Sequence, residues 1–98
     1  MLNQVVLVGR LVKDTEVKEL EEGKKVGYIT LAVNRAFKNE DGIYETDFID
    51  CVLWNGVAQN VSEYCKKGDV IGVKGRIQVR YTGEDLAIIT AIRTIMNV

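Results

Sequence analysis

Only one stretch of this chain has the spacing of a helix, and strand patterns stand on both sides of it. In residues 55–68, NGVAQNVSEYCKKG, apolar side chains recur at intervals of three and four: Val57, Val61, Tyr64 and Cys65. Asn55 can cap the start of such a helix, and Gly68 can close its end. We therefore predict one short helix of about three turns in a chain that otherwise forms strands.

Five segments alternate apolar and polar residues or run apolar throughout, as strands do: 3–12, 26–37, 44–54, 69–81 and 86–96. The turn between the second and third contains Asp41-Gly42, and Gly72 and Gly75 allow a bulge in the fourth. The predicted order is strand, strand, strand, helix, strand, strand. This is the plan of the OB-fold, so we predict an all-β, five-stranded antiparallel barrel with one short α-helix between strands 3 and 4.

Length and composition narrow the classes of function. The 98 residues are expected to form a single domain, 1–98. Histidine is absent, and the two cysteines, Cys51 and Cys65, are interpreted as buried structural thiols, so we expect no metal site and no cofactor. No apolar run approaches the roughly 20 residues of a membrane helix, and we see no signal peptide, so a cytoplasmic protein that contacts no membrane is expected.

The third strand places large rings on the face opposite its core. Ile49, Cys51 and Leu53 share one face, while the other carries Tyr44, Phe48 and Trp54. In OB-folds the outer face of strands two and three binds oligonucleotides or oligosaccharides, and an exposed ring there can stack on a base. The alternative is that these rings pack against another subunit. For Tyr44, Phe48 and Trp54 taken alone, the pattern leaves the two readings evenly balanced.

Cations accompany the rings, although the net charge of −1 argues mildly against a nucleic-acid partner. Arg35 and Lys38 flank Phe37, and Arg80 adjoins Tyr81. This pairing favours binding over packing. The predicted DNA-binding residues are four rings and six cations: Phe37, Phe48, Trp54, Tyr81, Arg10, Arg35, Lys38, Lys74, Arg76 and Arg80.

Five stretches in order resemble the bacterial single-stranded DNA-binding proteins, most of all those of low-GC Gram-positive bacteria and their phages. They are NQVVLVGRLVKDTEVK, ITLAVNRAF, TDFIDCVLW, QNVSEYCKKGD and VKGRIQVR. The resemblance implies an OB-fold that binds single-stranded DNA in replication, recombination and repair, near the nucleoid, as a homotetramer. It implies stacking by Phe37, Phe48, Trp54 and Tyr81, and phosphate contacts from Arg35, Lys74, Arg76 and Arg80.

The first strand is apolar on both faces, which predicts a subunit contact there, and the resemblance implies a dimer contact through Asn3 to Gly9. Two departures from the family pattern concern the end of the chain. Family members usually carry a long tail with an acidic tip, which is absent after TIMNV, so partners recruited through such a tip are in doubt. The turn TGED, residues 82–85, is also short.

Two other functions fit parts of the pattern. One is a tailless, dimeric replication-restart protein on the same barrel. The other is a metal-dependent nuclease, but Asp47 and Asp50 fall on opposite faces of their strand and no second acidic cluster points the same way. The sequence therefore favours a binding protein over an enzyme.

Overall fold

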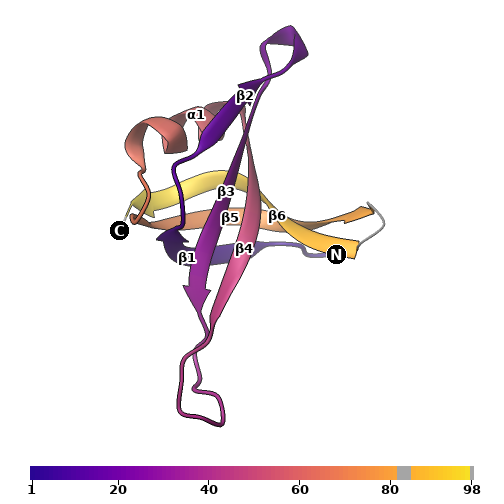
Figure 1. The fold of residues 1–98 in the computed structure, drawn as a ribbon. Helices are drawn as coiled ribbons and strands as arrows, with labels where there is room; N and C mark the ends of the chain where they lie inside the picture. The colour runs from indigo at the N-terminus through magenta and orange to yellow at the C-terminus, as the bar shows by residue number, and fades with distance from the viewer. Residues whose placement is uncertain (82–84, 98) are drawn as a thin grey trace.

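The computed structural model describes residues 1–81 and 85–97, and the side chains of residues 1–79. The elements in chain order are β1 (Val5–Leu11), β2 (Glu16–Glu19), the 3-10 turn η1 (Glu21–Gly23), β3 (Lys25–Asn34), β4 (Thr46–Trp54), α1 (Asn55–Tyr64), β5 (Val70–Tyr81) and β6 (Asp85–Asn97). Figure 1 shows long, strongly bent strands crossing one another, with a single α-helix at one end.

The strands form one sheet in the order β1-β5-β6-β4-β3-β2, and β1 also pairs with β3. This last pairing brings the sheet around on itself to form a barrel. The barrel is only partly closed, because the pairing covers just two positions, Arg10↔Ala32 and Leu11↔Leu31. Gly9 lies at this seam, where an added Cβ would stand 2.9 Å from the carbonyl oxygen of Ala32. The predicted OB-fold architecture, with a helix after the third long strand, is confirmed.

Two details differ from the expected barrel. The first is β2, a short edge strand that pairs with β3 from Glu16↔Tyr28 to Glu19↔Lys25 and offers only Val17 as an apolar signal. The second is the pairing of β4 with β6, which is parallel rather than antiparallel. The helix between β4 and β5 carries the chain across the end of the barrel, so that β6 returns in the direction of β4.

The core is filled from one face of each strand, as the alternation predicts. Leu31 of β3, Leu53 of β4 and Val73 of β5 are all fully buried, and Ala58 and Val61 of α1 close the same cluster. Cys51 and Cys65 are buried free thiols within it. Burial raises the pKa of Cys51 to about 12, so this thiol stays protonated at neutral pH.

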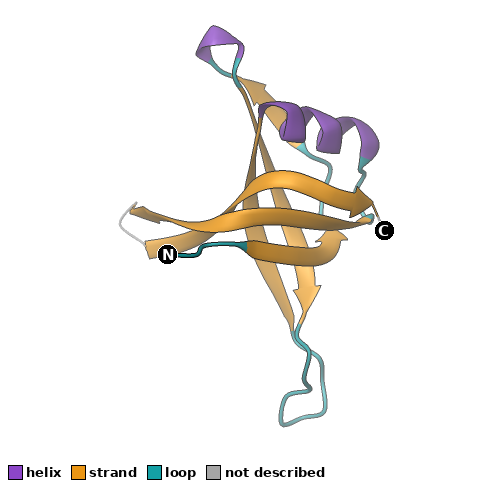
Figure 2. Cartoon of the chain, turned by 180° about the vertical axis from the view of Figure 1, so that it is seen from behind, coloured by secondary structure: helices purple, strands orange, loops and turns teal. Residues whose placement is uncertain are grey.

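The helix starts at the predicted place but not by the predicted cap. Trp54 is the N-cap residue, and no side chain caps the first turn. Asn55 has a φ of 49° and its Oδ1 accepts a hydrogen bond from the backbone N–H of Lys25 instead. The expected Asn55 cap is therefore wrong: the side chain ties the helix to β3, across which α1 packs (Figure 2). In the described ranges, 1–81 and 85–97, no helix is long and apolar enough to span a bilayer.

Strand β5 pairs with β6 along its length, with register shifts between Gly72 and Val73 and between Lys74 and Gly75. The irregularity expected at the two glycines is confirmed. Such bulges increase local twist and bend the strand that carries them.

Candidate nucleic-acid interface

The outer face of the β3–β4 pair carries the two exposed rings of β4, Phe48 and Trp54. The two strands pair over nine positions, and the register sets Phe48 opposite Ala32 and Trp54 opposite Val26. Paired residues point to the same side of a sheet, and this side is opposite the core. Phe48 is 67% exposed and Trp54 is 39% exposed, although Val52 between them is buried. The predicted division of β4 into a core face and a ring-bearing face is confirmed.

A hollow of about 530 Å³ lies beside Phe48, over the short seam between β1 and β3. Register aligns Arg10, Ala32 and Phe48 in one row across three strands. Arg10 and Asn34 bring polar groups to the walls, and Val8 and Phe48 bring apolar surface. The Arg10 guanidinium donates a hydrogen bond to the backbone oxygen of Gly68, which fixes its position at the rim. The structure thus brings together two sequence-predicted residues, Arg10 and Phe48, that lie far apart in the chain.

The connection between β3 and β4 projects from the end of the barrel opposite α1 (Figure 1) and carries Phe37, which is 85% exposed. Its tip is an ordered turn. Asn39 Oδ1 accepts hydrogen bonds from the backbone N–H groups of Asp41 and Ile43, at 2.9 and 3.0 Å, and Gly42 has a positive φ of 76°. These bonds are typical of an Asx-type turn, and glycine suits the left-handed position.

Lys38 follows Phe37 directly, but its ammonium group already has a local partner. The Nζ atom lies 5.5 Å from the centroid of the Tyr44 ring, on the other side of the connection. This geometry is a cation–π contact, which orients the lysine without neutralising its charge. Lys38 and Phe37 line the same hollow in this connection. Tyr44, whose role the pattern left open, has a contact with Lys38.

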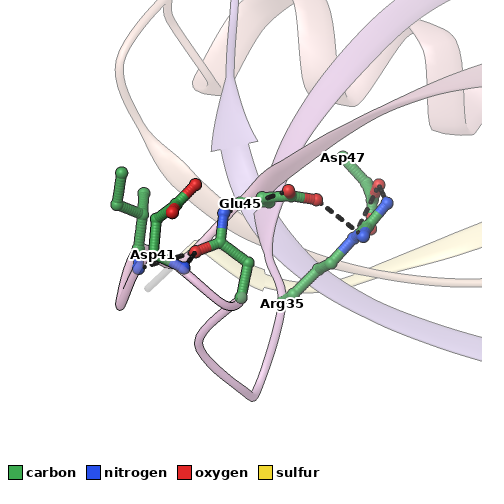
Figure 3. A network of polar contacts seen from close by, with 6 residues as sticks. Arg35, Asp41, Glu45 and Asp47 are labelled. Atoms are coloured by element: carbon green, nitrogen blue, oxygen red, sulfur yellow. Dashed lines mark hydrogen bonds and ion pairs between the residues drawn. The ribbon is translucent and has the colours of Figure 1, made fainter.

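Arg35 lies between two carboxylates, as Figure 3 shows. Its guanidinium forms ion pairs with Glu45 at 2.7 Å and with Asp47 at 3.0 Å. Asp47 pairs with Val33 on the core-facing side of the hairpin, so Arg35 is held on the side away from Phe48. In this structure the arginine braces the base of the hairpin rather than lining the ring-bearing face. Its predicted phosphate contact stays a prediction.

The brace predicts a measurable pH dependence. Hydrogen bonds from Arg35 lower the pKa of Asp47 below its ordinary value of 3.8. A lowered folded-state pKa means that the carboxylate stabilises the hairpin above the unfolded-state value, and that this contribution is lost as the pH falls through the folded-state pKa. Arg35→Ala is therefore expected to raise the pKa of Asp47, measured by NMR titration of its side-chain carbonyl. Arg10→Ala, a matched loss elsewhere, should leave that titration unchanged, and equal curves for wild type and Arg35→Ala would contradict the brace.

The cations predicted on β5 fall into two groups. Arg76 is exposed, and it pairs with Thr90 of β6, which in turn pairs with Val52 of β4. Arg76 therefore lies on the face that carries Trp54, about 10 Å from Val52 across two strand spacings. Lys74 is half-buried and pairs with Val6, so it lies beside β1. The side chains of Arg80 and Tyr81 lie outside the described residues.

The two aspartates of β4 have separate partners. Asp47 bonds to Arg35, whereas Asp50 Oδ1 accepts a hydrogen bond from the Thr30 hydroxyl at 2.8 Å. They lie on opposite faces of the strand, as their spacing predicts. Among the side chains of residues 1–79, no group of three or more acidic, cysteine or histidine residues is placed to hold a metal ion.

Residues 2–86 match the single-strand binding protein family. The chain belongs to that family. Single-stranded DNA-binding protein B of Bacillus subtilis is 50% identical over 86 residues, which are 87% of this chain and 76% of that protein. Single-stranded DNA-binding protein A of the same organism is 54% identical over 80 residues, 82% of this chain and 46% of that protein.

A solved structure agrees. A deletion mutant of the single-stranded DNA binding protein from Thermus aquaticus superimposes with a TM-score of 0.78 at 26% identity, over 95% of this chain and 49% of that chain. The chain thus spans about half the length of that relative and of several others, among them the Bacillus cereus single-stranded DNA-binding protein, of which it covers 51% at 52% identity.

Sequence reasoning within this family pattern missed one part of the ring-bearing face. Tyr28 is not among the predicted DNA-binding residues, yet it is exposed on the same face as Phe48. It lines a separate hollow with Asp50 and Lys13. The equal parity of Tyr28 and Asp50 on neighbouring strands was the available signal. The approach of Lys13 was not visible, because it depends on how the chain leaves β1.

Proposed function

We propose that this protein binds single-stranded DNA without strong sequence preference, protects it during replication, recombination and repair, and is not an enzyme. The observation that carries the proposal is the exposure of Phe37, Phe48 and Trp54 along the β3–β4 hairpin and its barrel face. Large rings that are exposed together on one surface are typical of an interaction site. The names of the Bacillus relatives support the same partner.

The mechanism follows from what each group can contact. Every base has a π-face, so stacking on Phe37, Phe48 or Trp54 tolerates any sequence and contributes about 1–3 kcal/mol per base. Phosphate contacts are assigned to the cations on or near this face, Arg10, Arg76, Lys38 and Lys74. The family pattern adds Arg35 and Arg80 as phosphate contacts and Tyr81 as a stacking ring. Duplex DNA keeps its bases stacked inside the helix, so it offers the rings nothing to bind.

The test is a titration with oligo-dT and with duplex DNA of equal length, at low and at high salt. We expect Trp54 fluorescence to fall with oligo-dT, duplex DNA to bind at least about tenfold more weakly, and the affinity to drop as salt rises because counterions are released from DNA. Equal affinity for both forms, or no quench and no binding by anisotropy, would overturn the proposal.

We further propose that the protein assembles as a homotetramer through dimers that meet at strand 1, Asn3 to Gly9. Val6 and Val8 of β1 point away from the core and are 57% and 54% exposed. Within residues 1–81 and 85–97, strand pairing on the second edge of β1 is confined to Arg10 and Leu11, so Val5 to Gly9 present a free edge there. Both features suit pairing with a second copy.

The same assembly separates this function from its alternative. A tailless replication-restart protein on this barrel is expected to be a dimer, whereas a protein with the proposed function is expected to be a tetramer. The mass in solution therefore distinguishes the two. In either case the partner is single-stranded DNA, and we place the protein in the cytoplasm, at the nucleoid.

A further inference from the structure

A second hollow on the ring-bearing face contains none of the residues that the sequence predicted to bind DNA. It has a volume of about 290 Å³, near the lower end of the range of ligand pockets, and it lies on the outer side of β3 and β4. Its lining includes an aromatic ring, a carboxylate, a hydroxyl and an ammonium group, from Tyr28, Asp50, Thr30 and Lys13. These are the groups with which proteins hold a base and its phosphate.

Register fixes Asp50 within the row of rings. Thr30↔Asp50 is the strand pair between Ala32↔Phe48 and Tyr28↔Val52. Asp50 is therefore about 7 Å along β4 from Phe48 and lies on the diagonal from Tyr28. A strand of DNA stacked on Phe48 and continuing toward Trp54 would pass over this carboxylate.

The carboxylate is held in a fixed position and keeps an acceptor available. The Thr30 hydroxyl donates to Oδ1 at 2.8 Å, which orients the group and leaves Oδ2 without a hydrogen-bond partner among the side chains of residues 1–79. The ion pairs of that part of the chain involve Arg35 and its two carboxylates, and none reaches Asp50. A full negative charge therefore stands in the middle of a face that must accept a polyanion.

This charge constrains how DNA can lie. A phosphate placed over Asp50 would be repelled, whereas a base edge that carries N–H donors would be attracted. Lys13 also lines the hollow and offers a cation for the phosphate. The arrangement thus assigns the backbone to Lys13, the flat face of a base to Tyr28 and the edge of that base to Asp50.

We propose that this hollow reads one base, and that Asp50 accepts a hydrogen bond from an exocyclic amine. Cytosine, adenine and guanine carry such an amine, whereas thymine presents the O4 acceptor where cytosine presents its N4 amine. A carboxylate facing O4 gains no hydrogen bond and meets a second acceptor, and the N3–H donor on that edge of thymine lies between two carbonyl oxygens that repel the carboxylate. The protein therefore binds cytosine more tightly than thymine at this subsite, while the stacking rings stay indifferent. This inference rests on the proposed function.

The experiment compares oligo-dC with oligo-dT of equal length by fluorescence anisotropy, at mildly alkaline pH, for wild type, Asp50→Asn and Asp50→Ala. The measured quantity is the ratio of the two dissociation constants, because the loss of a negative charge strengthens phosphate binding for both oligonucleotides and cancels in the ratio. We expect the preference for oligo-dC relative to oligo-dT to fall by about threefold to tenfold in both variants, the net effect of one typical hydrogen bond.

Glu19→Gln is the matched control, since Glu19 is an exposed acid on β2 outside the hollow and its replacement changes the net charge by the same amount. It should leave the ratio at the wild-type value. Lys13→Gln should lower the salt dependence of binding by about one released counterion. An unchanged ratio in both Asp50 variants overturns the inference while the proposed function stands. A wild-type protein that binds neither oligonucleotide refutes the proposed function, and the inference with it.

Discussion

Replacing Phe37 and Phe48 together by alanine is expected to weaken the binding of single-stranded DNA by about 2–6 kcal/mol, at least about thirtyfold in Kd, because each ring is assigned to one stacked base. Both side chains are largely exposed, and neither belongs to the buried cluster. Stability should therefore change little, within about 0.5 kcal/mol for each substitution. Affinity is measured by anisotropy of a labelled oligonucleotide and stability by urea unfolding.

Tyr64→Ala provides a matched loss of an exposed ring. Tyr64 lies on α1, at the end of the barrel opposite the β3–β4 connection, and is exposed like Phe37. Its removal should leave DNA affinity unchanged. A double variant that binds as tightly as wild type, or a Tyr64 variant that is equally weakened, would show that the rings of the hairpin and barrel face do not contact the bases.

Replacing Val6 and Val8 by lysine is expected to break the strand 1 contact, with association there weakened at least about a hundredfold and the mass in solution reduced to half or less. A dimer contact with twofold symmetry presents each substitution twice, so four lysines would meet in one apolar interface. Juxtaposed like charges cost several kcal/mol. The mass in solution, measured by sedimentation equilibrium, reports the result.

Val12→Lys is the control for that change, because Val12 is a partly exposed valine just beyond β1 and outside the proposed contact. It should preserve the mass of the wild type. If the Val6 and Val8 variant keeps the same mass while remaining folded by circular dichroism, strand 1 is not the subunit contact. The mass of the wild type also distinguishes a tetramer from the dimer expected of a replication-restart protein.

Alternation along the strands was sufficient to predict most of the architecture. In β4 the burial of Cys51 and Leu53 and the exposure of Phe48 follow from the two-residue period alone. The same rule accounts for the burial of Ile29 and Leu31, and the change of period after Trp54 located the helix. These features depend on the spacing of apolar residues along one segment, which can be read from the sequence alone.

What the sequence could not predict depends on contacts between distant segments. Arg35 reads as a free cation beside Phe37, but folding brings Glu45 and Asp47 across the hairpin to bind it. Asn55 reads as a helix cap, but β3 offers it the N–H of Lys25. The hollow around Asp50 requires the register of β3 against β4 and the path of the chain after β1, and neither is set by any short motif.

The alternation in β4 from Thr46 to Cys51 has a consequence for how such a protein can diverge. Residues that hold the barrel together and residues that meet its ligand occupy every second place on the same strand. Selection can therefore exchange Phe48 or Asp50 and retune affinity or base preference at little cost to the fold. The deletion of a single residue within the strand would instead disrupt the fold, because it would turn the rings of the ring-bearing face inward and the core side chains outward in one step.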